Sequence, residues 1–232
     1  MNRFSAMPPA IKMGASLFIF TSISRCFLPF SLLFLMILEG NLFAGDPVVG
    51  IVARVRGQVT ARRTGDETIT TLKVGDRIFV GHIVESAKDS GAQLVFTDDS
   101  FVNVLPGTTL FVKQYEYSAD TGRRTAVIKV SDGRARFVQY KRMGRESRFT
   151  VEMGHALVSV GISDFFVNVS RSETEIVNIG QSISVKNVSY LAVGVVQLGS
   201  NQKSIIKEKT PPSQPATVAP EQRRKYLKDA EI

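Results

Sequence analysis

The chain has 232 residues, a formal net charge of +8 and a pI near 9.7, which allow contact with an anionic surface and also suit a soluble domain. Its only cysteine, Cys26, lies in the predicted leader, so disulfides, zinc–thiolate sites and cysteine nucleophiles are excluded from the mature chain. After removal of the leader the length suits one globular domain.

The N-terminal segment, residues 1–44, has the pattern of a secretory signal peptide. Arg25 precedes the apolar run Phe27–Leu38, which is too short to cross a bilayer because a spanning helix needs about 20 apolar residues. A small residue, Ala44, follows and marks the expected cleavage site. The alternative is an uncleaved anchor, and membrane contact is expected only in that case.

Short strands separated by turns are expected from Val48 to Tyr117. Val, Ile, Thr and Phe dominate this region, and Gly75-Asp76, Asp98-Asp99-Ser100 and Pro106-Gly107 are typical turn sequences. Next, Ala119–Arg124 is expected to be a loop. Asp132-Gly133 then predicts a hairpin that pairs Ala126–Val130 with Ala135–Tyr140.

A basic cluster extends from Arg134 to Arg148, overlaps the second strand of this hairpin and contains one acid, Glu146. It is interpreted either as a solvated face or as a contact for phosphate or carboxylate groups, to which arginine offers paired donors. The candidate contact residues are Arg134, Arg136, Lys141, Arg142, Arg145 and Arg148.

The stretch Phe149–Val185 carries the strongest strand signal. Apolar residues recur at almost every second position up to Val169, and a second alternation includes Ile176 and Val185. Gly180 indicates a bend or a close backbone approach. The predicted fold is therefore all-β, a compact roll or sandwich of many short strands over residues 45–200.

Residues 201–232 are expected to form a disordered, Pro-rich and charged tail. The prolines of 210–215 cannot contribute ladder hydrogen bonds, and a helix after Pro220 would be marginal in isolation.

Six motifs, in order, resemble those of the FecR-like domain, a family named for a bacterial ferric-citrate regulator. The resemblance covers about Val48 to Pro215, and its motifs lie at Val55–Val59, Leu72–Ile78, Gly91–Ser100, Leu105–Leu110, Asp132–Arg136 and Thr174–Val185.

The sequence departs from this family at three places. Met153-Gly154 replaces the usual Thr-Pro, Gly161-Ile162-Ser163 replaces Arg-Gly-Thr, and Ile179 replaces a glutamate. The missing arginine removes a donor that could pin neighbouring loops. The short segment before the apolar runs leaves no room for the cytoplasmic part that controls a sigma factor in the type protein.

The resemblance implies a bacterial periplasmic or secreted module that binds and senses by contact. Its expected partner is an envelope protein or an anionic envelope polymer. The alternative is a structural or assembly component of the envelope that docks through its tail.

No enzymatic chemistry, cofactor or nucleic-acid partner is expected. His82 and His155 are interpreted as surface or edge residues, and Asp98-Asp99 as turn caps, since the spaced ligands of a calcium loop are missing.

Overall fold

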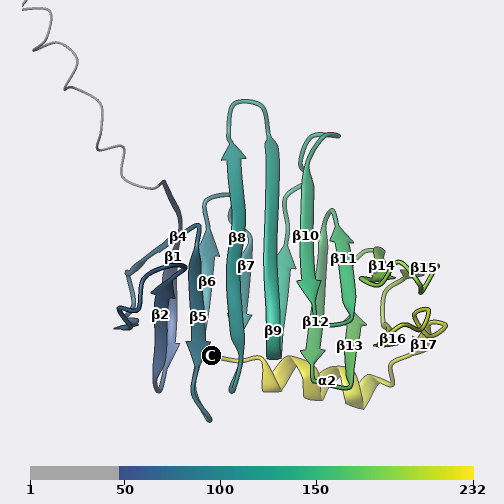
Figure 1. The fold of residues 1–232 in the computed structure, drawn as a ribbon. Helices are drawn as coiled ribbons and strands as arrows, with labels where there is room; N and C mark the ends of the chain where they lie inside the picture. The colour runs from purple at the N-terminus through teal and green to yellow at the C-terminus, as the bar shows by residue number, and fades with distance from the viewer. Residues whose placement is uncertain (1–46) are drawn as a thin grey trace, which may run out of the picture. The chain divides into compact units, whose positions relative to one another are not determined.

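The computed structural model describes residues 47–232, so the predicted signal peptide lies outside the described residues. Residues 46–232 form one compact unit. Two sheets build it, as the all-β prediction requires, and they face each other across a common core (Figure 1). Within residues 47–232, no helix combines the length and apolar composition needed to span a bilayer.

Sheet A contains nine strands, of which one, β9, is shared with the other sheet. In spatial order they are β4 (Arg77–Phe79), β1 (Val48–Arg56), β6 (Gly91–Phe96), β7 (Phe101–Val104), the second half of β9 (Arg123–Gln139), β12 (Ser163–Val169), β13 (Glu173–Asn178), β16 (Gln202–Lys207) and β17 (Ala216–Thr217).

Sheet B is built in the same way around the first half of β9. Its order is β3 (Thr70–Thr71), β2 (Val59–Arg63), β5 (His82–Ser86), β8 (Thr109–Ser118), β9, β10 (Arg148–Met153), β11 (Ala156–Val160), β14 (Ile183–Asn187) and β15 (Val195–Leu198). The described strands pair antiparallel, except that β9 and β10 run parallel.

The predicted hairpin about Asp132-Gly133 is wrong, because one continuous strand, β9, runs through both residues. The two halves of β9 do not pair with each other: Arg123–Asp132 pairs with β8 and β10, and Gly133–Gln139 pairs with β7 and β12. Gly133 adopts φ +87° here, and a Cβ on it would lie 2.4 Å from the carbonyl oxygen of Gly107. The chain therefore changes sheets at a position that only glycine accommodates.

The core lies between the sheets, where the alternation of Phe149–Val185 places its apolar side chains. Phe137 of sheet A stacks on Phe165 at 5.2 Å between ring centroids and meets Phe149 of sheet B edge-on at 6.3 Å. All three rings are buried. Gly180 also fulfils its predicted role, because a Cβ on it would lie 2.3 Å from the backbone nitrogen of Asp164.

The prediction of a disordered tail is wrong. Strand β16 pairs along its whole length with β13 and buries Ile206 completely. The last element, α2 (Pro220–Asp229), crosses the outer face of sheet A (Figure 1), where Tyr226 packs on Phe166 with ring centroids 5.5 Å apart. Packing against the sheet supplies the stability that an isolated helix of this length lacks.

Candidate partner-binding site

The loop 140–147, which joins β9 to β10, forms one end of the sandwich together with the β8–β9 turn. The backbone N–H of Gly144 donates to the carbonyl of Gly122 at 3.0 Å, and Ser147 Oγ donates to the same carbonyl at 3.2 Å. Ser147 Oγ also accepts from the backbone N–H of Arg124 at 3.0 Å. These bonds hold the loop in one conformation, which fixes where its side chains emerge.

Three of the six predicted contact residues make ion pairs within the domain. Arg136 donates to both carboxylate oxygens of Asp164 at 2.9 and 2.7 Å, and this hydrogen bonding raises the pKa of Arg136. Arg134 lies 3.6 Å from the carboxylate of Asp229 on α2. Lys141 pairs with Asp99. All three charges are therefore paired within the domain. Arg136 links β9 to β12, and Arg134 links β9 to α2.

The other three predicted residues, Arg142, Arg145 and Arg148, are exposed. None of them makes an ion pair or a side-chain hydrogen bond to any residue within 47–232. Arg145 lines a pocket of about 470 Å³ with Arg123, Thr121 and Ser118, and Arg142 lines a neighbouring pocket of about 190 Å³. Three of the six predicted residues are therefore paired within the domain, and the other three are exposed and able to contact a partner.

A buried polar network lies beneath this loop, and the sequence analysis missed it. Arg124 Nη1 donates to Asp98 Oδ2 at 2.5 Å, and Arg124 Nη2 donates to Gln139 Oε1 at 2.9 Å. Arg124 also lies over the ring of Phe149, 4.8 Å from its centroid. All of these side chains are at most 2% exposed. The guanidinium thus joins sheet B to the β6–β7 turn and to the second half of β9.

Asp98 performs its predicted turn capping and also holds the centre of this network. Its Oδ1 accepts from the backbone N–H and Oγ of Ser100, at 3.0 and 2.6 Å, and from the hydroxyl of Tyr115 at 2.6 Å. Burial opposes ionisation, but these bonds and the one from Arg124 outweigh it and hold the pKa of Asp98 below its usual value. Burial and the charge of Asp98 raise the pKa of Tyr115.

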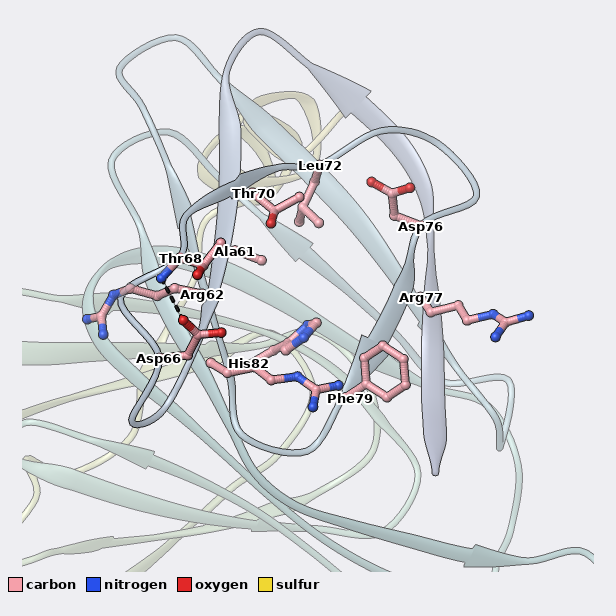
Figure 2. Close-up of a pocket in the computed structure, with 11 residues that line it drawn as sticks. Ala61, Arg62, Asp66, Thr68, Thr70, Leu72, Asp76, Arg77, Phe79 and His82 are labelled. Carbon is pink, nitrogen blue, oxygen red and sulfur yellow. Dashed lines mark hydrogen bonds between the residues drawn. The ribbon is translucent and has the colours of Figure 1, made fainter. Parts of the chain in front are cut away.

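A third pocket, of about 370 Å³, lies among strands β2 to β5 and contains His82 (Figure 2). Phe79 contacts the His82 ring edge-on at 5.3 Å, and the guanidinium of Arg63 lies 4.6 Å from the centroid of Phe79. Burial, and then the charge of Arg63, lower the pKa of His82. His82 is therefore a half-buried residue at a pocket, and its surroundings favour the neutral imidazole.

The remaining predicted polar residues have local roles. His155 Nε2 lies 3.1 Å from the carbonyl oxygen of Arg171. At the position where the family has an arginine motif, Ser163 Oγ donates to Asn178 Oδ1 at 2.7 Å and pins the neighbouring turn. Among residues 47–232, no group of three or more His, Cys, Asp or Glu side chains could hold a metal ion.

Comparison with known proteins gives a family match for part of the chain and similar solved structures. Residues 82–180 match the family model described as FecR protein. Two crystal structures of a putative anti-sigma factor from Parabacteroides distasonis ATCC 8503, at 1.65 and 2.50 Å resolution, resemble the chain with 16% sequence identity and a TM-score of 0.49. The match covers 62% of this chain and 63% and 62% of theirs. No curated protein matches the chain. The segment that matches the FecR family model, residues 82–180, contains both halves of β9, the buried Arg124 network and the exposed arginines.

Proposed function

We propose that the protein is a non-enzymatic, extracytoplasmic module for binding and sensing, and that it contacts an envelope protein or an anionic envelope polymer. The observation that carries this proposal is the exposure of Arg142, Arg145 and Arg148 at one end of the domain without ion-pair partners among the described residues. All three lie inside the segment that matches the FecR family.

The family supports the regulatory part of the proposal. FecR domains belong to a regulatory family that is typically associated with the cell envelope, and such a domain acts by contact with other molecules. The export signal expected in residues 1–44 supports a location outside the cytoplasm.

Arginine suits this role because its planar guanidinium donates two parallel hydrogen bonds to a carboxylate or a phosphate. Loop 140–147 is fixed by Gly144 and Ser147, so its arginines lose less conformational freedom on binding than side chains on a mobile loop. Contacts between exposed charges weaken at high salt, since the Debye length falls from about 10 Å at 0.1 M to about 3 Å at 1 M.

The proposal is tested by retention of envelope fractions on the immobilised protein at low and high salt. We expect the triple variant Arg142→Gln, Arg145→Gln, Arg148→Gln to lose most of the salt-sensitive binding. The matched control is Arg54→Gln, Arg223→Gln, Arg224→Gln, which removes the same charge from exposed positions without ion pairs elsewhere in the described chain. If both variants lose binding equally, net charge alone accounts for the interaction. If both retain binding equally, Arg142, Arg145 and Arg148 are not part of the binding surface.

The alternative function, an assembly component that docks through its tail, is not favoured. The segment assigned to docking contains β16 and α2, which pack on the domain itself.

A further inference from the structure

The connection between β14 and β15 exposes apolar side chains at the far end of sheet B from β3. Tyr190 is 89% exposed and Val193 85%, and Val188, Leu191 and Val195 are each at least half exposed. No charged residue occurs between Lys186 and Lys203. Such a grouping of exposed apolar side chains marks a contact surface, whereas single exposed apolar residues are ordinary.

The connection is held firmly by Asn187. This buried residue donates through Nδ2 to the carbonyls of Lys207 and Thr210 at 2.7 and 2.8 Å, and its Oδ1 accepts from the backbone N–H of Ser189 at 2.7 Å. Ala192 packs inward and is 5% exposed. The exposed side chains are thus presented on a fixed backbone, which lowers the entropic cost of binding.

Beside this connection, one row of residues crosses the outer face of sheet B at a single level. Strand pairing places Lys129 opposite Glu152, Glu152 opposite Leu157, Leu157 opposite Lys186, and Lys186 opposite Val195. The row runs across β9, β10, β11, β14 and β15. It forms the floor of a groove of about 660 Å³ whose wall includes Val188, Tyr190 and Val193.

The groove has a net positive floor. Glu152 is paired with Lys113 outside the groove at 2.7 Å. Lys129 and Lys186 make no ion pair with any residue in 47–232. Three inter-strand steps separate these two lysines, or about 14 Å at 4.7–4.9 Å per step. Leu157 lies between them in the row.

We infer that this groove binds an extended segment of a partner protein that carries two acidic side chains four residues apart with an apolar side chain between them. An extended chain advances about 3.3 Å per residue and points residues i, i+2 and i+4 to the same side, so acids at i and i+4 span about 13 Å. They reach Lys129 and Lys186, while residue i+2 lies over the row between Glu152 and Leu157. An apolar residue at i+6 then meets Val195 and the wall of the groove.

A polypeptide fits this groove better than a lipid surface or a polyanion. The two cations have a defined spacing, Leu157 between them and Val195 beyond them are apolar, and Glu152, which also lies between them, is paired with Lys113. This pattern matches alternating side chains on one strand. None of Arg142, Arg145 and Arg148 lines this groove, so this inference extends beyond the proposed function.

The test uses the mature protein and fluorescence anisotropy of a fluorescein-labelled peptide, Ser-Glu-Ser-Val-Ser-Glu-Ser-Val-Ser. A second peptide of identical composition, Ser-Glu-Ser-Glu-Ser-Val-Ser-Val-Ser, places the acids two residues apart. We expect saturable binding of the first peptide and about fivefold weaker binding of the second, because one exposed ion pair contributes up to about 1 kcal/mol.

The decisive variant is Lys129→Glu, Lys186→Glu. It is expected to weaken binding of the first peptide by at least about tenfold and to create binding of the analogue with lysine in place of glutamate. Val193→Ser should weaken both interactions. The control, Lys73→Glu, Lys225→Glu, makes the same charge change at exposed positions away from the groove and should leave the Kd of the first peptide unchanged.

Three results would overturn the inference. They are equal affinity for both acid spacings, failure of the charge reversal to exchange the preferred peptide, and binding confined to vesicles that contain anionic lipid. The last result would assign the exposed apolar side chains to a membrane surface.

Discussion

Arg124 and Asp98 show how a single buried pair can connect distant parts of a chain. The two residues lie 26 positions apart in sequence and come from β9 and from the β6–β7 turn. Burying an unpaired charge costs far more than burying a paired one, so each residue depends on the other. Removal of either partner leaves a charged group in the core with no counter-ion.

We therefore expect Asp98→Asn to destabilise the domain by about 3–5 kcal/mol, the range measured when one partner of a buried ion pair is removed. Urea denaturation at pH 7 measures this change. Asp99→Asn is the matched control, because Asp99 is a neighbouring exposed residue of the same turn and its pair with Lys141 is exposed. Its cost should stay below about 1 kcal/mol. Similar values for the two variants would contradict a central role for the buried pair.

The lowered pKa of Asp98 determines how the destabilisation by Asp98→Asn depends on pH. A carboxyl group with a lowered folded-state pKa contributes stability above its unfolded pKa, 3.8 here, and loses it as pH falls through the folded value. The gap in unfolding free energy between wild type and Asp98→Asn should thus be full near pH 7 and narrow below pH 3.8. Denaturation series at several pH values measure it, and a gap that widens in acid would refute the assignment.

Sequence reasoning reached some of these residues and missed others for a physical reason. The capping role of Asp98 is local, since its acceptor serves Ser100 two positions away, and turn chemistry predicts it. Its partner Arg124 was placed in a loop, because nothing near Arg124 in sequence indicates that its side chain enters the core. Likewise, the six cations form one cluster in sequence, but Asp164 and Asp229 neutralise two of them only after folding.

At the scale of elements, the change of sheet within β9 distinguishes this fold from the predicted one. Alternation correctly predicted the strands around Phe149–Val185, because side-chain period depends only on neighbours in sequence. Pairing depends on contacts across the chain. Asp132-Gly133 therefore predicted a hairpin turn, whereas the strand continues through both residues and crosses to the other sheet.

Gly133→Ala is expected to destabilise the domain by more than about 3 kcal/mol, because it combines an unfavourable positive φ with a clash against Gly107 and Thr108. Gly65→Ala is the matched control: its φ is +82°, and no atom lies within 4 Å of the added Cβ. That change should cost about 1 kcal/mol. Thermal and urea unfolding of both variants separate the cost of the positive φ from the cost of the clash. Equal losses of stability would mean that β9 tolerates a side chain at Gly133.

For the whole molecule, the C-terminal segment is part of the folded domain. Phe166 and Val177 pair across β12 and β13 on the outer face of sheet A, and α2 covers them with Tyr226 and Leu227. Asn103 Nδ2 also donates to the carbonyl of Ala230 at 2.8 Å. The sequence did not predict this arrangement, because the prolines at 210–215 suggested a tail. They belong to the connection that follows β16 and carry no information about α2.

Deletion of residues 219–232 should therefore lower the unfolding free energy by roughly 2–5 kcal/mol, the value for exposing two or three partly buried apolar side chains. It should also increase binding of a hydrophobic dye as Phe166 and Val177 become exposed. Arg224→Ala, at an exposed position on the same helix, should change neither quantity by more than about 0.5 kcal/mol. Unchanged stability after the deletion would restore the interpretation of this segment as a tail.

The passage of β9 from one sheet to the other has a mechanical consequence. If the two layers slid over each other, the same strand would have to break ladder bonds on β8 and β10 in one layer and on β7 and β12 in the other. Resistance to shear is thus supplied by covalent backbone as well as by interlayer packing. A load applied to one layer is therefore transmitted to the other through the backbone of β9 as well as through side-chain packing.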